Sequence, residues 1–285
     1  MSRHDPVTIQ APAKLNIRLK ITGRRQDGYH QLVSIMVPIG LMDHLELDVI
    51  PRGIKLTCQG HSVPVDEENL AFRAARSFFS YARLDRGVSI KLTKNIPVGA
   101  GLGGGSSDAA CVLKGLNDIW SNPLSSKELE SLALHLGADV PFFLYNKPCV
   151  ATGIGEVLEP IEKWSEFWYV IIMPPLHIST SWVYDNLRLQ LTSGEYEYIN
   201  NRIKKGLLKV VDILENDLEE VTASHFPVIK ALKKELIDAG AEGALMSGSG
   251  PSVFGVFRHK KEALLAKRYL TPKALGELFA VKGLP

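Results

Sequence analysis

The sequence has few cysteines, no long apolar run and almost no net charge, and each shortage argues against a class of protein. Its three cysteines lie far apart and form no Cys-x-x-Cys pair, so we expect neither a disulfide framework nor a structural zinc site, and a reducing cytoplasm suits the chain. No apolar run approaches the roughly 18 residues that a membrane helix needs, and residues 1–5 are too polar to open a signal peptide. The 33 basic and 31 acidic residues leave a formal charge of +2, which argues against a nucleic-acid-binding face. We therefore expect a cytoplasmic protein with no nucleic-acid partner and no membrane partner.

Length and composition are those of an ordinary globular protein. Of the 285 residues, 45% are hydrophobic and 22% are charged. At roughly 100–200 residues per domain, the chain forms one large domain or two modest ones. Pro160 and the polar residues that follow it indicate a boundary, so we predict domains at residues 1–160 and 161–285.

Apolar periodicity predicts a mixture of strands and helices. Apolar and polar residues alternate over 14–21, which predicts a half-buried strand with Lys14 and Asn16 on the same face. Ser125 and Glu128 have the spacing of a capping box at the start of a helix. The other predicted strands are 43–49, 88–92, 169–173, 244–246 and 253–257, and the other predicted helices are 67–81, a helix capped by Ser106 or Ser107, 203–221, 227–239 and 262–270.

The strongest functional signal is the loop 97–107, where five of the seven residues 99–105 are glycine. Glycine destabilises a helix or strand by roughly 0.5–1 kcal/mol, but it lets backbone N–H groups approach an anion closely. Ser106 and Ser107 add hydroxyl groups, and the following helix presents free N–H groups and a positive dipole end. Strand, loop and helix together predict a phosphate site, and the alternative is a flexible loop without a ligand.

The loop 97–107 differs from three common nucleotide motifs. Residues 99–104 fit the dinucleotide pattern formally, but Pro97 separates them from the preceding strand. Asp118, the acidic residue at the expected distance, falls in the tail of a predicted helix. No lysine follows the glycines, so the Walker pattern is absent, and the protein-kinase motifs His-Arg-Asp and Asp-Phe-Gly are missing as well.

Three further segments carry candidate chemistry. Asp139 lies between the end of a helix and the apolar stretch 142–145, read as a strand, which suits an acid/base role; the alternative is a turn. Lys14, beside Asn16, can neutralise a phosphate, and the alternative is a solvated strand lysine. The second glycine–serine turn, 247–250, offers backbone donors, and the alternative is a tight hairpin.

Taken in this order, the four segments resemble the GHMP kinases, a superfamily of small-molecule kinases. Residues 12–16, 97–109 and 247–255 match its three motifs, and the resemblance covers nearly the whole chain. It implies an α+β, two-domain GHMP kinase fold with the active site in the cleft between the domains. The N-terminal domain would be ribosomal protein S5 domain 2-like and the C-terminal domain ferredoxin-like. The resemblance also implies ATP as phosphate donor, with Mg²⁺ carried by ATP and no dedicated protein metal site.

The resemblance assigns roles to individual residues. Asp139 would accept the proton of the acceptor hydroxyl, and Lys14 would stand near that hydroxyl and the transferred phosphate. The residues matched to the ATP site are Pro97, Gly99, Gly101, Leu102, Gly103, Gly104, Gly105, Ser106, Ser107, Asn69 and Lys94. The residues matched to the acceptor site are Asn16, Tyr29, His30, Thr180 and Tyr184.

Narrower features resemble one branch of the superfamily, whose acceptor carries a cytidine diphosphate moiety. They are residues 24–30, 101–110, 137–141 and 216–219, including three consecutive glycines before two serines. The cytosine would lie between Tyr29 and Tyr184, where stacking contributes about 1–3 kcal/mol per base, with His30 at its polar edge. The proline expected after the threonine of this branch is missing here.

The expected partner is therefore a small molecule with a cytidine diphosphate moiety, and the expected assembly is a monomer or a weak homodimer. Two alternatives stay open at this point. One is another GHMP kinase, of the homoserine or mevalonate type. The other is a ligand-sensing relative without catalysis, which the presence of both Lys14 and Asp139 opposes.

Overall fold

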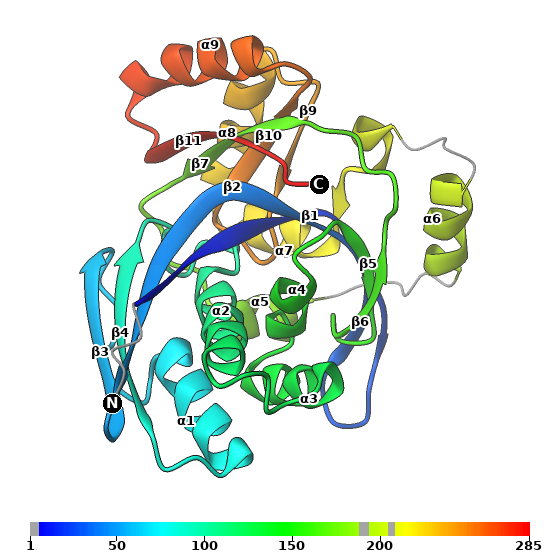
Figure 1. Cartoon of the computed structure of the whole chain (residues 1–285). Coiled ribbons are helices and arrows are strands. Elements are labelled where there is room, and N and C mark those ends of the chain that lie inside the picture. The colour runs from blue at the N-terminus through cyan, green and yellow to red at the C-terminus, as the bar shows by residue number, and fades with distance from the viewer. Residues whose placement is uncertain (1–5, 188–193, 205–208) are drawn as a thin grey trace. The chain divides into compact units, whose positions relative to one another are not determined.

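The computed structural model describes residues 6–187, 194–204 and 209–285, and their helices and strands are drawn in Figure 1. The chain divides into two compact units, each discontinuous in sequence. Unit 1 takes the described residues of Met1–Ala13, Leu41–Val98 and Gly103–Asn146, and unit 2 takes those of Lys14–Gly40, Gly99–Leu102 and Lys147–Pro285. These units do not follow the predicted division at residue 160, which stays a prediction.

Unit 1 is a group of strands covered by helices. β3 (Gly53–Gly60) runs parallel to β4 (Gly87–Lys94), and β4 runs antiparallel to the second half of β2 (His30–Ile50). The helices lie on one side of these strands (Figure 1). They are α1 (Leu70–Ala82), α2 (Gly104–Ile119), α3 (Ser126–Leu136) and α4 (Val140–Tyr145).

Unit 2 contains a four-stranded antiparallel sheet in the order β11-β7-β10-β9. Two helices, α8 and α9, cover one face of it, where Leu232 and Ala266 join Val170 and Phe257 in one apolar core. On the other face the buried rings of Tyr169 and Phe254 make an edge contact. The bounds are β7 (Trp168–Met173), α8 (Val228–Asp238), β9 (Gly243–Met246), β10 (Val253–Phe257), α9 (Lys260–Leu270) and β11 (Glu277–Lys282).

The long strands β1 (Val7–Arg24) and β2 contribute residues to both units. In unit 2, β1 runs parallel to the two-residue strand β8 (Glu215–Asn216) and β2 runs antiparallel to β5. The remaining elements of this unit are β5 (Cys149–Thr152), β6 (Val157–Pro160), α5 (Thr180–Asp185), α6 (Glu195–Lys204), the 3₁₀ turns Val210–Ile213 and Thr271–Lys273, and α7 (Asp217–His225).

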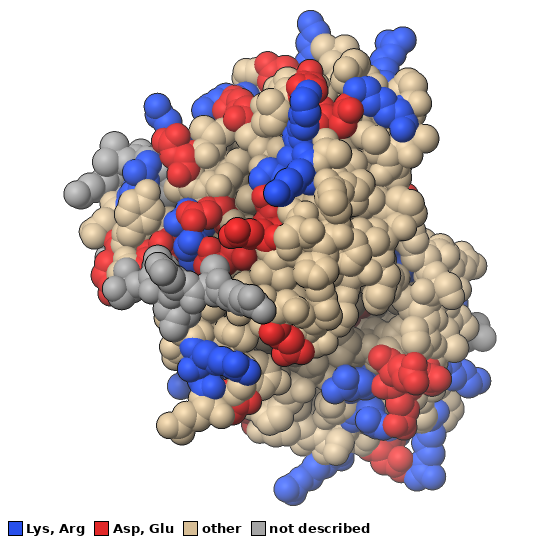
Figure 2. Space-filling view, turned by 180° about the vertical axis from the view of Figure 1, so that it is seen from behind, with Lys and Arg blue, Asp and Glu red and all other residues tan. Residues whose placement is uncertain are grey.

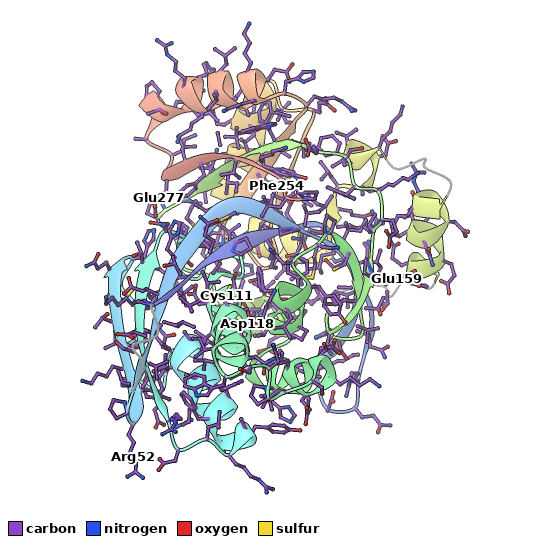
Figure 3. All side chains as sticks on the ribbon, viewed as in Figure 1. Arg52, Cys111, Asp118, Glu159, Phe254 and Glu277 are labelled. Atoms are coloured by element: carbon purple, nitrogen blue, oxygen red, sulfur yellow. The ribbon has the colours of Figure 1, made fainter. Side chains whose placement is uncertain are left out.

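Most of the predicted elements are confirmed, because their local signals are strong. The alternating stretch 14–21 lies within β1, and the capping box of Ser125 and Glu128 opens α3. Asp118 lies within α2, as its helical surroundings indicate (Figure 3). The elements confirmed with small shifts in their ends are 67–81, 88–92, 169–173, 227–239, 244–246, 253–257 and 262–270.

Two local predictions are wrong, and a third differs only in extent. Helix α2 begins one turn earlier than expected, because Gly103 takes the left-handed conformation at its N-cap, so Ser106 and Ser107 lie inside the helix. The apolar stretch after Asp139 is the short helix α4 and not a strand, with Pro141 in its first turn. The predicted strand 43–49 is confirmed as a strand, but it is the second half of β2, which continues unbroken from His30.

The helix predicted over 203–221 is also wrong. Its apolar spacing is helical, but Leu214 is extended, Glu215 and Asn216 pair with β1, and α7 begins only at Asp217. Residues 205–208 of the predicted helix lie outside the described residues. Pairing with a distant strand overrides the local helical periodicity here. The spacing of apolar residues in a sequence gives no information about such pairing.

The surface and the cysteines match an ordinary globular chain. Basic and acidic side chains are interspersed on the face shown in Figure 2. Within the part of the chain that the structure describes, no helix has the length and apolar character to cross a membrane. Cys111 and Cys149 are buried as expected, whereas Cys58 is partly exposed.

We predict that Ser125→Ala lowers the free energy of unfolding by about 1 kcal/mol, because it removes the capping acceptor of α3. Urea unfolding measures the loss. The matched control is Ser126→Ala, the next residue, which is exposed and forms no part of the capping box. Equal losses in the two variants would contradict the capping role.

Candidate active site

The unit 1 part of the predicted phosphate loop is the start of helix α2. Gly103 has φ +72, and no side chain caps the helix. The first N–H groups of an α-helix have no intrahelical acceptor, so those at the start of α2 are available to an anion. The hydroxyl of Ser107 is fully buried and has no hydrogen-bond partner within the described ranges. Free backbone donors and an unsatisfied buried hydroxyl suit a phosphate group.

Behind this helix start lies a buried ionic cluster of Asp43, Lys94 and Asp108. The ammonium of Lys94 donates to Asp43 Oδ2 and, over 2.8 Å, to Asp108 Oδ2. The three residues are 0%, 3% and 2% exposed. Asp43 Oδ1 also accepts the backbone N–H groups of Asn95 and Ile96, at 2.6 and 2.8 Å. The cluster therefore joins the end of β4 to the second turn of α2.

Burial and charge act against each other in this cluster. Burial opposes the charged form of Lys94, but the charges of Asp108 and Asp43 outweigh it and raise the pKa of Lys94. Burial raises the pKa of the Asp108 carboxyl, and the positive charge of Lys94 offsets this only in part. Sequence analysis found Lys94 but missed its two partners, because neither a lone aspartate on a strand (Asp43) nor one inside a helix (Asp108) carries a local signal of ion pairing.

In unit 2, Lys14 and Asn16 lie on β1 as predicted, and both are buried. The Lys14 ammonium donates to Asn16 Oδ1, and Asn16 Nδ2 donates to Ser34 Oγ over 2.9 Å. Ser34 Oγ in turn donates to the backbone oxygen of Arg18 over 2.6 Å. This chain of hydrogen bonds holds the Lys14 side chain in one orientation.

The unit 2 part of the phosphate loop, Gly99–Leu102, is bound to β1 and to the second glycine–serine turn. The N–H of Lys14 donates to Leu102 O over 2.9 Å, and Ser247 Oγ donates to Gly101 O over 3.1 Å. A Cβ on Gly101, whose φ is +75, would lie 2.2 Å from the backbone oxygen of Ser247. Glycine is therefore required at this position for two reasons, backbone conformation and space.

Asn216 is a structural residue of this site that sequence analysis placed inside a helix. Its Nδ2 donates to Met246 O and Gly248 O over 2.8 and 2.7 Å, and its Oδ1 accepts the N–H of Leu218. It thus caps α7 and holds the turn 247–250 at once. An asparagine N-cap followed by Glu219 at the third helical position is the signal that could have found it.

The predicted acceptor residues His30 and Tyr184 are brought together in unit 2. Their rings stack with centroids 5.2 Å apart and planes at 29°. Burial lowers the pKa of His30, the charge of Arg24 lowers it further, and Asp185 opposes the shift, so the ring is neutral at pH 7. Tyr29 is 59% exposed, and its side chain is open to a ligand.

The other predicted residues have local contacts of their own. The exposed Thr180 shares a 2.8 Å hydrogen bond with Ser249 of the turn 247–250. Asn69 caps α1 through Ala71 N and donates to Pro64 O. Asp139 occupies the N-cap position of α4, but its side chain makes no capping hydrogen bond. The ligand-binding roles of these three residues stay predictions.

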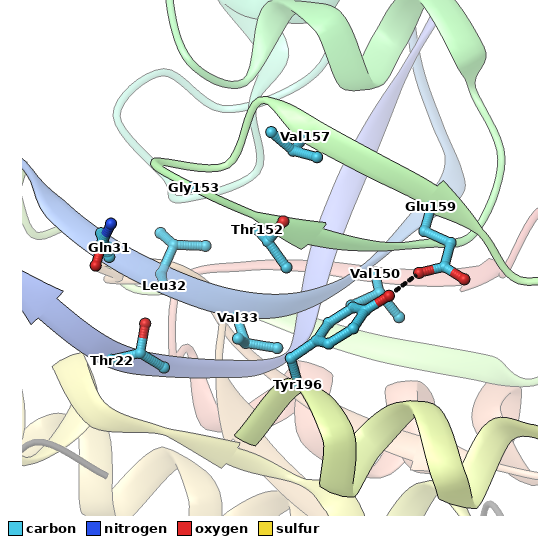
Figure 4. Close-up of a pocket in the computed structure, with 10 residues that line it drawn as sticks. All are labelled: Thr22, Gln31, Leu32, Val33, Val150, Thr152, Gly153, Val157, Glu159 and Tyr196. Carbon is cyan, nitrogen blue, oxygen red and sulfur yellow. Dashed lines mark hydrogen bonds between the residues drawn. The ribbon is translucent and has the colours of Figure 1, made fainter. Parts of the chain in front are cut away.

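A separate open pocket of about 360 Å³ lies in unit 2 (Figure 4). Tyr196 of α6 closes one side of it by donating a hydrogen bond to Glu159 of β6. None of the predicted site residues lines this pocket. Its lining residues are Thr22, Gln31, Leu32, Val33, Val150, Thr152, Gly153, Val157, Glu159 and Tyr196.

Comparison with known proteins agrees with the resemblance that the sequence motifs indicate. The family model of the GHMP kinases N terminal domain matches residues 69–147, and that of the GHMP kinases C terminal matches residues 203–276. The 4-diphosphocytidyl-2-C-methyl-D-erythritol kinase of Syntrophotalea carbinolica is 47% identical over 273 residues, which cover 95% of this chain and 97% of that protein.

Solved structures give the same result. A crystal structure of 4-(cytidine 5'-diphospho)-2C-methyl-D-erythritol kinase has a TM-score of 0.83 and 36% identity, and the match covers 98% of this chain and 100% of that one. A homoserine kinase from Cytophaga hutchinsonii has a TM-score of 0.78 at 18% identity, with 100% and 96% covered. The second likeness shows the fold alone.

We predict that Gly101→Ala destabilises the protein and abolishes most of its activity, because the added methyl group collides with Ser247 O. The matched control is Gly240→Ala. Gly240 also has a positive φ, +93, but its Cβ would meet nothing within 4 Å, so only the backbone cost of about 1–2 kcal/mol applies. Urea unfolding and ATP turnover of both variants measure the difference. Equal stability and turnover in the two would contradict the close contact.

Proposed function

Because the chain belongs to the GHMP kinase family, we propose that it is an ATP-dependent kinase that phosphorylates the 2-hydroxyl of 4-diphosphocytidyl-2-C-methyl-D-erythritol. This reaction belongs to the non-mevalonate route to isoprenoid precursors. The near full-length identity of 47% to a kinase with this name supports the acceptor. The observation that best supports the activity is the glycine–serine loop. It is followed directly by α2, whose first turn contains the buried hydroxyl of Ser107, which has no hydrogen-bond partner within the described residues.

Phosphoryl transfer depends on positioning and on neutralising the charge of the transferred group more than on covalent chemistry. In our proposal the backbone N–H groups of Gly103–Ser106 hold the phosphates of ATP. Asn69 is the residue that we assign to the adenine side. Lys94 was matched to the same side, but its ammonium is bound by Asp43 and Asp108. The buried position of Ser107 Oγ suits a contact with a phosphate oxygen or with its metal ion.

Lys14 and Asp139 are the proposed catalytic residues. The hydrogen bond to Asn16 keeps the Lys14 ammonium in place, so its charge can be directed at the transferred phosphate. The Asp139 carboxylate lies at the N-cap position of α4, where we place the acceptor hydroxyl. Asp139 then orients that hydroxyl and accepts its proton.

The acceptor side of the proposal rests on the aromatic pair His30 and Tyr184. A neutral imidazole both donates and accepts hydrogen bonds, as the polar edge of cytosine requires. Tyr184 and the exposed Tyr29 provide ring faces for the base, and Asn16 and Thr180 provide polar contacts.

We also propose that Mg²⁺ arrives bound to ATP. The ion would neutralise phosphate charge, with Ser107 Oγ as the candidate protein ligand and phosphate oxygens and waters as the rest. Across residues 6–187, 194–204 and 209–285, no group of three or more His, Cys, Asp or Glu side chains is arranged to hold a metal ion. A cytoplasmic location, a monomer or weak homodimer, and the lack of nucleic-acid and membrane partners are parts of the same proposal.

We predict that Asp139→Asn lowers kcat by at least about 100-fold, because the amide cannot accept the hydroxyl proton. The affinity for ATP should stay within about twofold, as isothermal titration with a non-hydrolysable analogue will measure. Asp118→Asn, an exposed aspartate of α2, is the matched control and should retain full turnover. Near-normal turnover of the Asp139 variant would remove its catalytic assignment.

We predict that, in a coupled ADP assay, 4-diphosphocytidyl-2-C-methyl-D-erythritol is the preferred acceptor over homoserine and mevalonate. The stacked pair of His30 and Tyr184 suits a nucleobase, which the other two acceptors lack. Turnover of homoserine or mevalonate, without turnover of the cytidine compound, would assign the chain to another GHMP activity. Binding of the cytidine compound without ADP release would indicate a ligand sensor.

A further inference from the structure

We propose that Asp43, Lys94 and Asp108 act as one positioning unit that sets the phosphate loop for ATP. The inference rests on the proposed kinase function, and it gives Lys94 an indirect role in place of contact with the nucleotide. All three residues, and the part of the loop that they hold, belong to unit 1.

The cluster holds both ends of the loop. Lys94 is the last residue of β4, and the next two N–H groups, of Asn95 and Ile96, bind Asp43 Oδ1. Asp108 lies in the second turn of α2, and its carboxylate shares the Lys94 ammonium with Asp43. One ammonium therefore connects the strand before the loop to the helix after it.

The same ammonium also lies close to the first residue of α2. A Cβ on Gly104, the first residue of α2, would lie 2.8 Å from Lys94 Nζ and 2.9 Å from a methyl carbon of Ile96. The first residue of the helix therefore packs so closely against the cluster that no side-chain atom fits between them. A shift of Lys94 or Ile96 is transmitted to the N–H groups that face the phosphates.

The cluster is both ionic and buried, and this combination requires an explanation. Burying charges opposes folding unless partners are well placed, and well-packed apolar residues often stabilise a core as much or more. An ionic cluster is needed here because two backbone N–H groups require an acceptor and because directional bonds fix the backbone better than apolar packing does. Since Lys94 already serves two carboxylates, its charge is committed inside the protein.

The experiment uses the full chain with Lys94→Met, Asp108→Asn, Asp43→Asn and the double variant Lys94→Met/Asp108→Asn. Titration with a non-hydrolysable ATP analogue and Mg²⁺ measures affinity, and steady-state kinetics gives KM for ATP and for the acceptor. Lys91→Met is the matched control. It breaks an ion pair to Glu46 between the same two strands, β4 and β2, but at the surface, where Lys91 is 64% exposed.

We expect ATP affinity to fall at least tenfold in Lys94→Met and in Asp108→Asn, with KM for the acceptor unchanged. The double variant should be no weaker than the poorer single variant, because residues that act as a unit are not additive. Asp43→Asn should lose less, since its amide oxygen still accepts the two N–H groups. Lys91→Met should stay within twofold of the parent.

Two results would overturn the proposal. If Lys94→Met loses ATP affinity while Asp108→Asn and Asp43→Asn keep it within twofold, Lys94 contacts ATP directly. If all variants bind ATP normally and only their urea midpoints fall, the cluster serves stability alone. Should Lys94→Met not fold, the two aspartate variants decide. Failure of the proposed function is separate, because it would appear as the parent protein not phosphorylating the cytidine acceptor while still binding the ATP analogue.

Discussion

Backbone N–H groups are the main donors of a phosphate loop that contains no lysine. Contacts from outside the loop must therefore fix its backbone, so that these N–H groups point toward the phosphate. The loop 97–107 meets this constraint differently along its length. In unit 1 the buried Lys94 and its two carboxylates hold the start of α2. In unit 2 the stretch Gly99–Leu102 is held by hydrogen bonds from the backbone N–H of Lys14 and from the side-chain hydroxyl of Ser247. Glycine gives the loop its shape, and neighbouring residues make that shape rigid.

The supports in unit 2 continue beyond the loop. The turn 247–250, which receives Gly101, is itself held by two hydrogen bonds from Asn216. Asn216 lies in β8 beside β1, the strand that carries Lys14 and Asn16. One network of hydrogen bonds in this unit therefore joins the proposed catalytic residue Lys14, the stretch Gly99–Leu102 of the phosphate loop and the turn 247–250. This arrangement explains why Asn216, a residue with no expected ligand, is buried like Lys14.

How much of this the sequence predicts depends on the range of the interaction. The capping box of α3 and the alternating strand around Lys14 were predicted correctly, because each is encoded within a few residues. The glycine loop was predicted too long, because Gly103 is the N-cap of α2. The helix expected over 203–221 was wrong, because pairing of Glu215 and Asn216 with β1 depends on residues nearly 200 positions away. Asp43 was predicted only as part of a strand, since its partner Lys94 is 51 residues later. The elements on which the candidate site residues lie could be predicted from the sequence. The residues that hold them in place could be identified only from the structure.

In our proposal, the contacts that select the acceptor are far fewer than the contacts that form the fold. A homoserine kinase with only 18% identity shares the overall fold, so the fold itself leaves the acceptor open. The stacked rings of His30 and Tyr184 are already in contact without a ligand, which means that little side-chain freedom remains to be lost when a base binds. In our proposal, the lowered pKa of His30 favours the neutral ring, which can match both the donors and the acceptors of a base. In the same proposal the two parts have different tasks: the phosphate loop positions the phosphate that is transferred, and the pair of His30 and Tyr184 selects the molecule that receives it.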